Sequence, residues 1–226
     1  DDASLLSRSA LVDVSSLSVG VVDVWRTGHE TTDALFDEAV QYVKELSQKV
    51  SASQMIATPD EVYTDEFTVL VHELRSDLDE YLAARATNGL PSSVRDVIEF
   101  NRANADVELL HFGQEIFEMA AKSSGRTAAE YVSARQRNLE WVHNNLDVAL
   151  QQHSILISPA YMPAWKTDFS TGHPLAGGAV TSPAAIAGLP IVTIPMGLVA
   201  GLPVGLSLVG AKNSEAMLIA LARSLE

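Results

Sequence analysis

The sequence predicts an α/β fold: part of a mixed β-sheet with flanking helices and a helical insertion. Three observations support this prediction. A short β-branched run at residues 18–24 precedes a segment with helical spacing of apolar residues, which is the order that starts a βαβ unit. Residues 60–151 follow a helical pattern with few interruptions. Seven of the nine prolines and eight of the thirteen glycines lie after residue 158, so extended chain and turns dominate the end.

The composition indicates a folded, acidic protein. Its 226 residues, 47% of them hydrophobic, suffice for a buried core. The formal net charge of −14 argues against a nucleic-acid partner, which would normally need a basic patch. Cysteine is absent, which excludes disulfides, a thiol nucleophile and zinc-thiolate sites. The first residues lack the basic and apolar regions of a signal peptide, so we expect a cytoplasmic protein.

The first elements are a strand and a helix. Residues 1–16 are polar and mixed, and we interpret them as a lead-in rather than a folded element. Residues 18–24 form the predicted strand. Thr32 is placed to cap a helix that begins at Asp33, and an apolar stripe at helical spacing continues to Val50.

The sequence of the middle of the chain predicts four helices. The first covers residues 61–87, and the Gly-Leu-Pro at residues 89–91 stops it. Ser92 or Ser93 starts a second helix through Phe100. Two further helices are predicted, at residues 107–121 and 128–151.

The sequence pattern at the end of the chain predicts buried strands. Residues 154–158 form a strand candidate, and no charged residue occurs between Phe169 and Ala211. Four prolines within residues 182–210 of this run exclude a membrane-spanning helix. We predict instead a short helix capped by Ser182 and a hairpin of strands at residues 191–196 and 204–209. Strands that are apolar on both faces need neighbours, so we expect an exposed apolar face or a self-associated homo-oligomer.

Two Glu-x-x-His pairs raise the possibility of a metal site. Glu108 with His111 and Glu140 with His143 have the spacing found in di-metal carboxylate helical bundles. At about 100° per residue, Glu140 points away from the apolar stripe of its helix. We therefore favour solvated helix faces over a metal site and keep the bundle as a distant alternative.

No nucleophile is complete in this sequence. Gly177, Gly178 and Ser182 match neither a phosphate-binding loop nor a nucleophile elbow. Lys166 lies in a loop after a predicted buried strand and could act as a base if it were desolvated. An ordinary exposed lysine is the favoured interpretation.

The order of several sequence blocks resembles the amidase-signature hydrolases, and most closely their bacterial peptide-amidase-like members. The matching blocks extend over roughly residues 15–226 and are, in order, Phe-Asn-Arg-Ala (100–103), Phe-Gly-Gln-Glu-Ile-Phe (112–117), Pro-Ala-Trp-Lys-Thr-Asp (163–168), Ser-Pro-Ala-Ala (182–185), Ala-Gly-Leu-Pro (187–190), Val-Thr-Ile-Pro-Met-Gly (192–197) and Gly-Leu-Pro-Val-Gly-Leu-Ser-Leu-Val-Gly (201–210). The joint order of these blocks makes the resemblance specific.

The resemblance implies an amidase that hydrolyses a carboxamide C–N bond without a cofactor. Such enzymes use a Ser-cisSer-Lys triad in a Gly/Ser-rich signature, and this chain holds neither that signature nor a matching lysine. We therefore expect the C-terminal portion of a longer protein, inactive alone, whose partners are the missing N-terminal signature half and a small amide substrate. No catalytic residue and no metal ligand carry over. The resemblance suggests five substrate-facing residues: Phe112, Gln114, Tyr161, Trp165 and Thr167.

On this interpretation residues 1–226 are one C-terminal portion of an amidase domain. Residues 17–58 form a strand-helix unit, residues 60–151 a helical cap, and residues 154–226 a segment that completes the sheet. Two alternatives stay open besides the metal bundle. One is a non-catalytic interaction or regulatory domain of amidase ancestry, and the other is an amidotransferase subunit.

Overall fold

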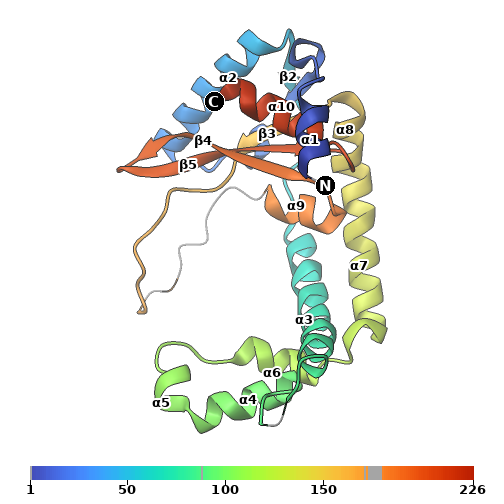
Figure 1. The fold of residues 1–226 in the computed structure, drawn as a ribbon, viewed down its shortest axis with the longest axis vertical. Coiled ribbons are helices and arrows are strands. Elements are labelled where there is room, and N and C mark those ends of the chain that lie inside the picture. Colours follow the sequence, from blue (N-terminus) through green and yellow to red (C-terminus); the bar gives the residue numbers. More distant parts are fainter. Residues whose placement is uncertain (1, 88, 171, 173–179) are drawn as a thin grey trace. The chain divides into compact units, whose positions relative to one another are not determined.

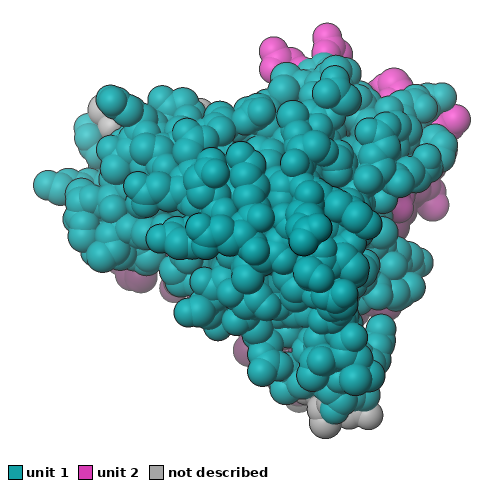
Figure 2. Space-filling view, turned by 90° about the horizontal axis from the view of Figure 1, so that it is seen from above, with its two compact units in different colours: residues 1–59, 139–226 teal, residues 60–138 magenta. Residues whose placement is uncertain are grey.

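A computed structural model describes residues 2–87, 89–170, 172 and 180–226. The chain forms two compact units, and Figure 1 labels helices and strands of both. Unit 1 consists of residues 1–59 and 139–226, and unit 2 consists of residues 60–138 (Figure 2). The helical insertion predicted at residues 60–151 thus extends past the end of unit 2.

Unit 1 contains a five-stranded mixed sheet in the order β2-β1-β3-β5-β4. Strands β2, β1 and β3 are parallel, whereas β5 runs antiparallel to both β3 and β4. The strands are β1 Ser18–Val21, β2 Lys49–Ala52, β3 Ile155–Pro159, β4 Ile191–Val199 and β5 Leu202–Gly210. The helices are α1 Asp2–Ser9, α2 Glu30–Leu46, α8 Val148–Gln152, α9 Thr181–Ala187 and α10 Glu215–Leu225, with short 3₁₀ turns at Val14–Ser16 and Asp23–Trp25. The predicted α/β class and hairpin are confirmed.

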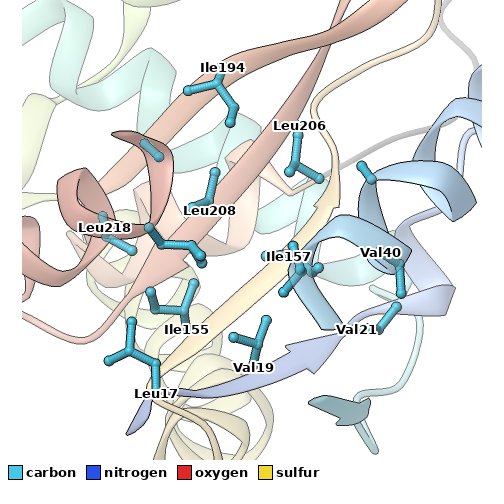
Figure 3. Packing of buried hydrophobic residues seen from close by; sticks show 14 of the residues in the cluster. Leu17, Val19, Val21, Val40, Ile155, Ile157, Ile194, Leu206, Leu208 and Leu218 are labelled. Carbon is cyan, nitrogen blue, oxygen red and sulfur yellow. The ribbon is translucent and has the colours of Figure 1, made fainter. Parts of the chain in front are cut away.

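One face of the sheet packs against α2 and α10 (Figure 3). Because side chains alternate along a strand, every second residue of β1, β3 and β5 points to this face. The residues that contribute are Val19, Val21, Ile155, Ile157, Leu206 and Leu208, which meet Phe36, Val40 and Val43 of α2 and Leu218 and Leu221 of α10. This face holds the larger of the two apolar clusters of unit 1.

The other face packs against the end of α7, α8 and α9. Val22, Leu156 and Val209 point this way and contact Leu146 and Ala184. Strands β3 and β5 are therefore buried on both faces, as their sequences predict. Strand β4 is not, because it lies at the edge of the sheet among the described strands and is only partly buried.

The structure of the first part of the chain differs from two predictions. Residues 1–16 are not a simple lead-in, since they form α1 and a 3₁₀ turn, and α1 packs against α10. Helix α2 begins before Asp33, and its N-cap is His29 rather than Thr32. The His29 ring nitrogen accepts a hydrogen bond from the Thr32 amide at 3.3 Å. The Asp33 carboxylate accepts a hydrogen bond from the Thr27 amide, before the helix, at 3.0 Å.

Strand β2 was missed because its residues continue the helical stripe of α2. The helix ends at Leu46, and the Ser47 hydroxyl then donates to the buried Leu17 carbonyl. This bond turns the chain, and β2 pairs with β1 in parallel register. The contact joins residues 30 positions apart, so local spacing could not reveal it.

The start of α9 also differs from the prediction. Ser182 is the second residue of α9 and not its N-cap, which is Val180 and offers no side-chain bond. The end of α9 agrees with the prediction of a turn at residues 188–190. Gly188 is left-handed at φ +66°, and the Leu189 amide donates to the Ala184 carbonyl at 2.9 Å. Glycine takes this conformation without steric cost.

The secondary-structure elements of unit 2 are all helical among its described residues. Its elements are α3 Asp60–Ala83, α4 Val94–Ala103, α5 Ala105–Glu108, α6 Glu115–Lys122, a 3₁₀ turn at Gly125–Thr127, and the first ten residues of α7 Ala129–Val142. A π-helical turn at His143–Asp147 joins α7 to α8, so the helix predicted at residues 128–151 is present with one irregular turn. The helix predicted at residues 107–121 is instead interrupted between α5 and α6. In the described ranges, no helix has the length and apolarity needed to cross a membrane.

Candidate substrate-facing surface

The loop that leaves β3 carries an aromatic pair. Strand β3 is buried along its whole length, and exposure begins immediately after Pro159. The rings of Tyr161 and Trp165 lie 6.1 Å apart at an interplanar angle of 47°. Trp165 remains 38% exposed, so the pair presents an aromatic surface to solvent beyond the carboxyl end of a buried strand. Sites of α/β sheets are commonly built at this position.

Thr167 and Lys166 follow in the same loop, and both side chains are exposed. Thr167 could donate or accept a hydrogen bond at the rim of the aromatic pair. The exposure of Lys166 agrees with the favoured interpretation of an ordinary surface lysine, because a lysine base needs desolvation.

A polar row beside this loop was not singled out from the sequence. Ser158 of β3, Ser207 of β5 and Thr193 of β4 are register partners across three strands. The Thr193 and Ser207 hydroxyl oxygens lie 3.1 Å apart, and the Ser158 hydroxyl donates to the Pro159 carbonyl at 3.0 Å. Ser158 and Ser207 are almost completely buried. These hydroxyls bond to one another and to backbone, so they fix the sheet beneath the loop rather than supply a nucleophile.

A close backbone approach at Gly205 joins the polar row to the loop. The Ala160 amide donates to the Gly205 carbonyl at 2.7 Å. A Cβ atom on Gly205 would lie 2.6 Å from the Thr193 methyl carbon and 3.1 Å from the Ala160 Cβ. Only glycine fits here without displacing the start of the loop.

The other two candidate residues, Phe112 and Gln114, belong to unit 2. Gln114 is buried, and its side chain bonds within that unit: its oxygen accepts from Asn101 Nδ2 at 3.1 Å, and its Nε2 donates to the Ile98 carbonyl at 3.4 Å. Phe112 is 59% exposed. Gln114 therefore anchors the segment between α5 and α6 that displays Phe112.

The remaining candidates do not form a centre. Gly177 and Gly178 lie outside the described residues, and Ser182 is a half-buried residue of α9. Glu108 and His111 belong to unit 2, whereas Glu140 and His143 belong to unit 1. His143 Nδ1 lies 3.3 Å from the Asp147 carboxylate at an exposed position. Among the residues that the structure describes, no group of three or more His, Asp and Glu side chains could hold a metal ion.

Comparison with known proteins shows a strong structural similarity. The crystal structure of PAM12A superposes with a TM-score of 0.87 at 28% identity, over 100% of this chain and 45% of that one. The peptide amidase from Stenotrophomonas maltophilia gives a TM-score of 0.82 at 28% identity, over 99% of this chain and 44% of that one. The fold of the whole chain is therefore found inside larger amidases.

Curated relatives include glutamyl-tRNA(Gln) amidotransferase A subunits. That of Methanococcoides burtonii is 27% identical over 242 aligned residues, covering 100% of this chain and 48% of the relative. That of Exiguobacterium sibiricum is 32% identical over 144 residues, covering 59% of this chain and 28% of the relative. The chain thus spans less than half the length of either. The sequence profile of the amidase family matches residues 7–219. With that match and the peptide amidase fold together, the chain belongs to the amidase family.

Proposed function

We propose that this chain is the C-terminal portion of an amidase that hydrolyses the C–N bond of a carboxamide. The observation that carries the proposal is the match to a peptide amidase over 99% of this chain, with a TM-score of 0.85 in one structure and 0.82 in another. Those matches cover only 45% and 44% of the larger chains. The remaining part of such a protein would carry the chemistry.

The proposed reaction uses a Ser-cisSer-Lys triad outside these 226 residues. The serine oxygen attacks the amide carbonyl carbon, and its proton passes through the relay to the leaving nitrogen. The C–N bond breaks, ammonia leaves, and backbone amides stabilise the oxyanion of the intermediate. Water then cleaves the acyl ester, which releases the carboxylic acid and regenerates the serine.

The part of this chain would be to shape the substrate site. The ring pair of Tyr161 and Trp165 offers apolar faces to a peptide side chain, and Thr167 offers a hydroxyl beside them. Phe112 offers a further exposed ring in unit 2. Gln114 would act by holding the Phe112 segment, since its amide bonds to Asn101 and Ile98. No cofactor is required by this chemistry.

The proposal is tested with a protein that extends this chain on its N-terminal side. We expect the upstream coding sequence to encode a lysine and a Gly/Ser-rich segment with two serines, and the extended protein to release ammonia from peptide C-terminal amides. Chymostatin is a competitive inhibitor of the related peptide amidase and provides a second probe.

Trp165→Ala should raise KM, whereas Tyr42→Ala, a change at a 61% exposed ring on α2, should leave KM unchanged. An extended protein without amidase activity would overturn the proposal and favour a non-catalytic interaction domain.

An amidotransferase A subunit is the second candidate. Its support is sequence similarity over the whole chain to the subunit of Methanococcoides burtonii. In that case the extended protein would need partner subunits, and it would release ammonia from glutamine rather than from peptide amides. The acidic charge of −14 favours the peptide amidase alternative, because direct contact with a tRNA backbone would call for basic residues.

A further inference from the structure

Unit 2 contains an open pocket between α3, α6 and α7. Its volume is about 360 Å³, at the lower end of the range for small-molecule sites. Three of its lining residues are apolar and three are ionisable: Phe67, Val71, Met119, His72, Lys122 and Glu130. All six belong to residues 60–138, so the pocket is a property of unit 2 alone.

The apolar wall of the pocket is incompletely buried. Phe67 is 44% exposed and Met119 is 40% exposed, while Val71 beneath them is buried. Leaving an aromatic ring and a thioether in water forgoes the free energy that their burial would contribute. An apolar group seated between them would bury both.

The polar side of the pocket contains the paired side chains of His72 and Glu130 and the ammonium group of Lys122. His72 Nδ1 lies 2.9 Å from the Gly125 carbonyl, which can only accept, so this nitrogen carries a proton. His72 Nε2 lies 3.0 Å from Glu130 Oε1, so the Glu130 carboxylate already has a partner within the pocket.

Lys122 is the lysine of the pocket lining. It is the last residue of α6 and is exposed, and no hydrogen bond or ion pair joins its ammonium group to another residue in the described part of the chain. The carboxylate nearest in sequence, Glu118, is already paired with Arg102 at 2.9 Å. An unpaired cation beside an unfilled apolar wall is a feature that selects an amphipathic anion.

We propose that this pocket binds a small amphipathic carboxylate, whose apolar body packs between Phe67 and Met119 and whose carboxylate pairs with Lys122. The site is separate from the amide-hydrolysing function and does not depend on it. A neutral molecule of the same shape binds through the apolar wall alone and is held more weakly. Cations are disfavoured because they meet Lys122.

The experiment titrates the 226-residue chain with 4-phenylbutanoate and with 4-phenylbutanamide, which has the same shape without the charge, by calorimetry at low ionic strength. The carboxylate is expected to bind about threefold more tightly, the size typical of an exposed ion pair. Lys122→Met abolishes that preference, whereas the matched change Lys44→Met on α2 of unit 1 retains it. Phe67→Ala weakens both ligands by roughly fivefold, since it removes part of the shared apolar wall.

Three results would overturn the proposal: equal affinity of the wild type for both ligands, a preference that survives Lys122→Met, or no binding of either ligand. Lys122 and Phe67 are both exposed, so the variants should fold. Circular dichroism checks that they do.

Discussion

The contacts that stabilise the interior of unit 1 differ in kind from those that stabilise unit 2. In unit 1, large apolar side chains from three neighbouring strands are removed from water on both faces of one sheet. In unit 2, few large side chains are fully buried, and polar side chains reach across to backbone groups. His72 lies against the Gly125 carbonyl, Arg75 donates to the Ala121 carbonyl, and Asp79 accepts from the Val94 amide.

This difference indicates which kind of substitution should destabilise each unit. Sheet packing depends on volume, so unit 1 should be sensitive to truncation of buried side chains. Helices joined by side-chain bonds depend on individual donors and acceptors, so unit 2 should be sensitive to their removal. Four experiments test this contrast, in decreasing order of the expected loss of stability.

The largest effect is expected for Leu208→Ala in β5. Leu208 is fully buried between β3, β4 and the helices above them, and its truncation should lower the free energy of unfolding by about 3 kcal/mol. Leu198→Ala in the same hairpin removes a 64% exposed side chain and should cost less than about 0.5 kcal/mol. Urea denaturation of both variants measures the difference, and equal costs would refute the packing account of unit 1.

The second effect is expected for His72→Leu in α3. This change leaves the Gly125 carbonyl and the Glu130 carboxylate without their shared partner, and we expect a loss of about 2 kcal/mol. The control is His143→Leu, because His143 is paired only with exposed Asp147 and its replacement should change stability by less than about 0.5 kcal/mol. Hydrogen exchange of the α3 amides locates the loss. If α3 protection is unchanged in His72→Leu, polar contacts do not hold unit 2.

A smaller effect is expected for Arg137→Met in α7. Arg137 pairs with Asp65 of α3 through two nitrogens, and this pairing raises the pKa of the guanidinium. The arginine is 59% exposed, so solvent screens the pair, and its removal should cost less stability than either Leu208→Ala or His72→Leu. High salt should reduce the cost further. A loss as large as that of His72→Leu would mean that surface pairs contribute more than expected.

The smallest effect concerns His153, the C-cap of α8. Burial lowers the pKa of this imidazole in the folded protein, so below about pH 6.5 the unfolded chain binds the proton more readily. Stability should therefore fall as the pH drops from 7.5 to 5.5. His153→Gln should have a flatter profile in urea titrations at the two pH values, and an unchanged slope would contradict the assignment.

The sequence predicted the elements whose signals are local. The β4–β5 hairpin, β3 and the long helices are each defined by periodicity, prolines or glycines within one segment. It did not predict α1, whose packing surface is provided by α10 at the other end of the chain. It also assigned β2 to a helix, because the Ser47 bond to Leu17 is a tertiary contact.

The candidate site was predicted in part. Tyr161 and Trp165 could be anticipated as a loop beyond a buried strand, and the structure places their rings together. The Ser158, Ser207 and Thr193 row was overlooked, because three separate segments become neighbours only when the sheet register is known. The burial of Gln114 likewise depends on α4, which supplies Asn101 and Ile98.

The most direct measurement is ammonia release from a peptide C-terminal amide by the purified 226-residue chain alone. Unit 1 supplies a sheet and the aromatic pair of Tyr161 and Trp165, and under the proposed function the nucleophile and its base lie outside this chain. It predicts no ammonia above the buffer blank at any protein concentration. Ammonia release that rises in proportion to the concentration of this chain would contradict the account.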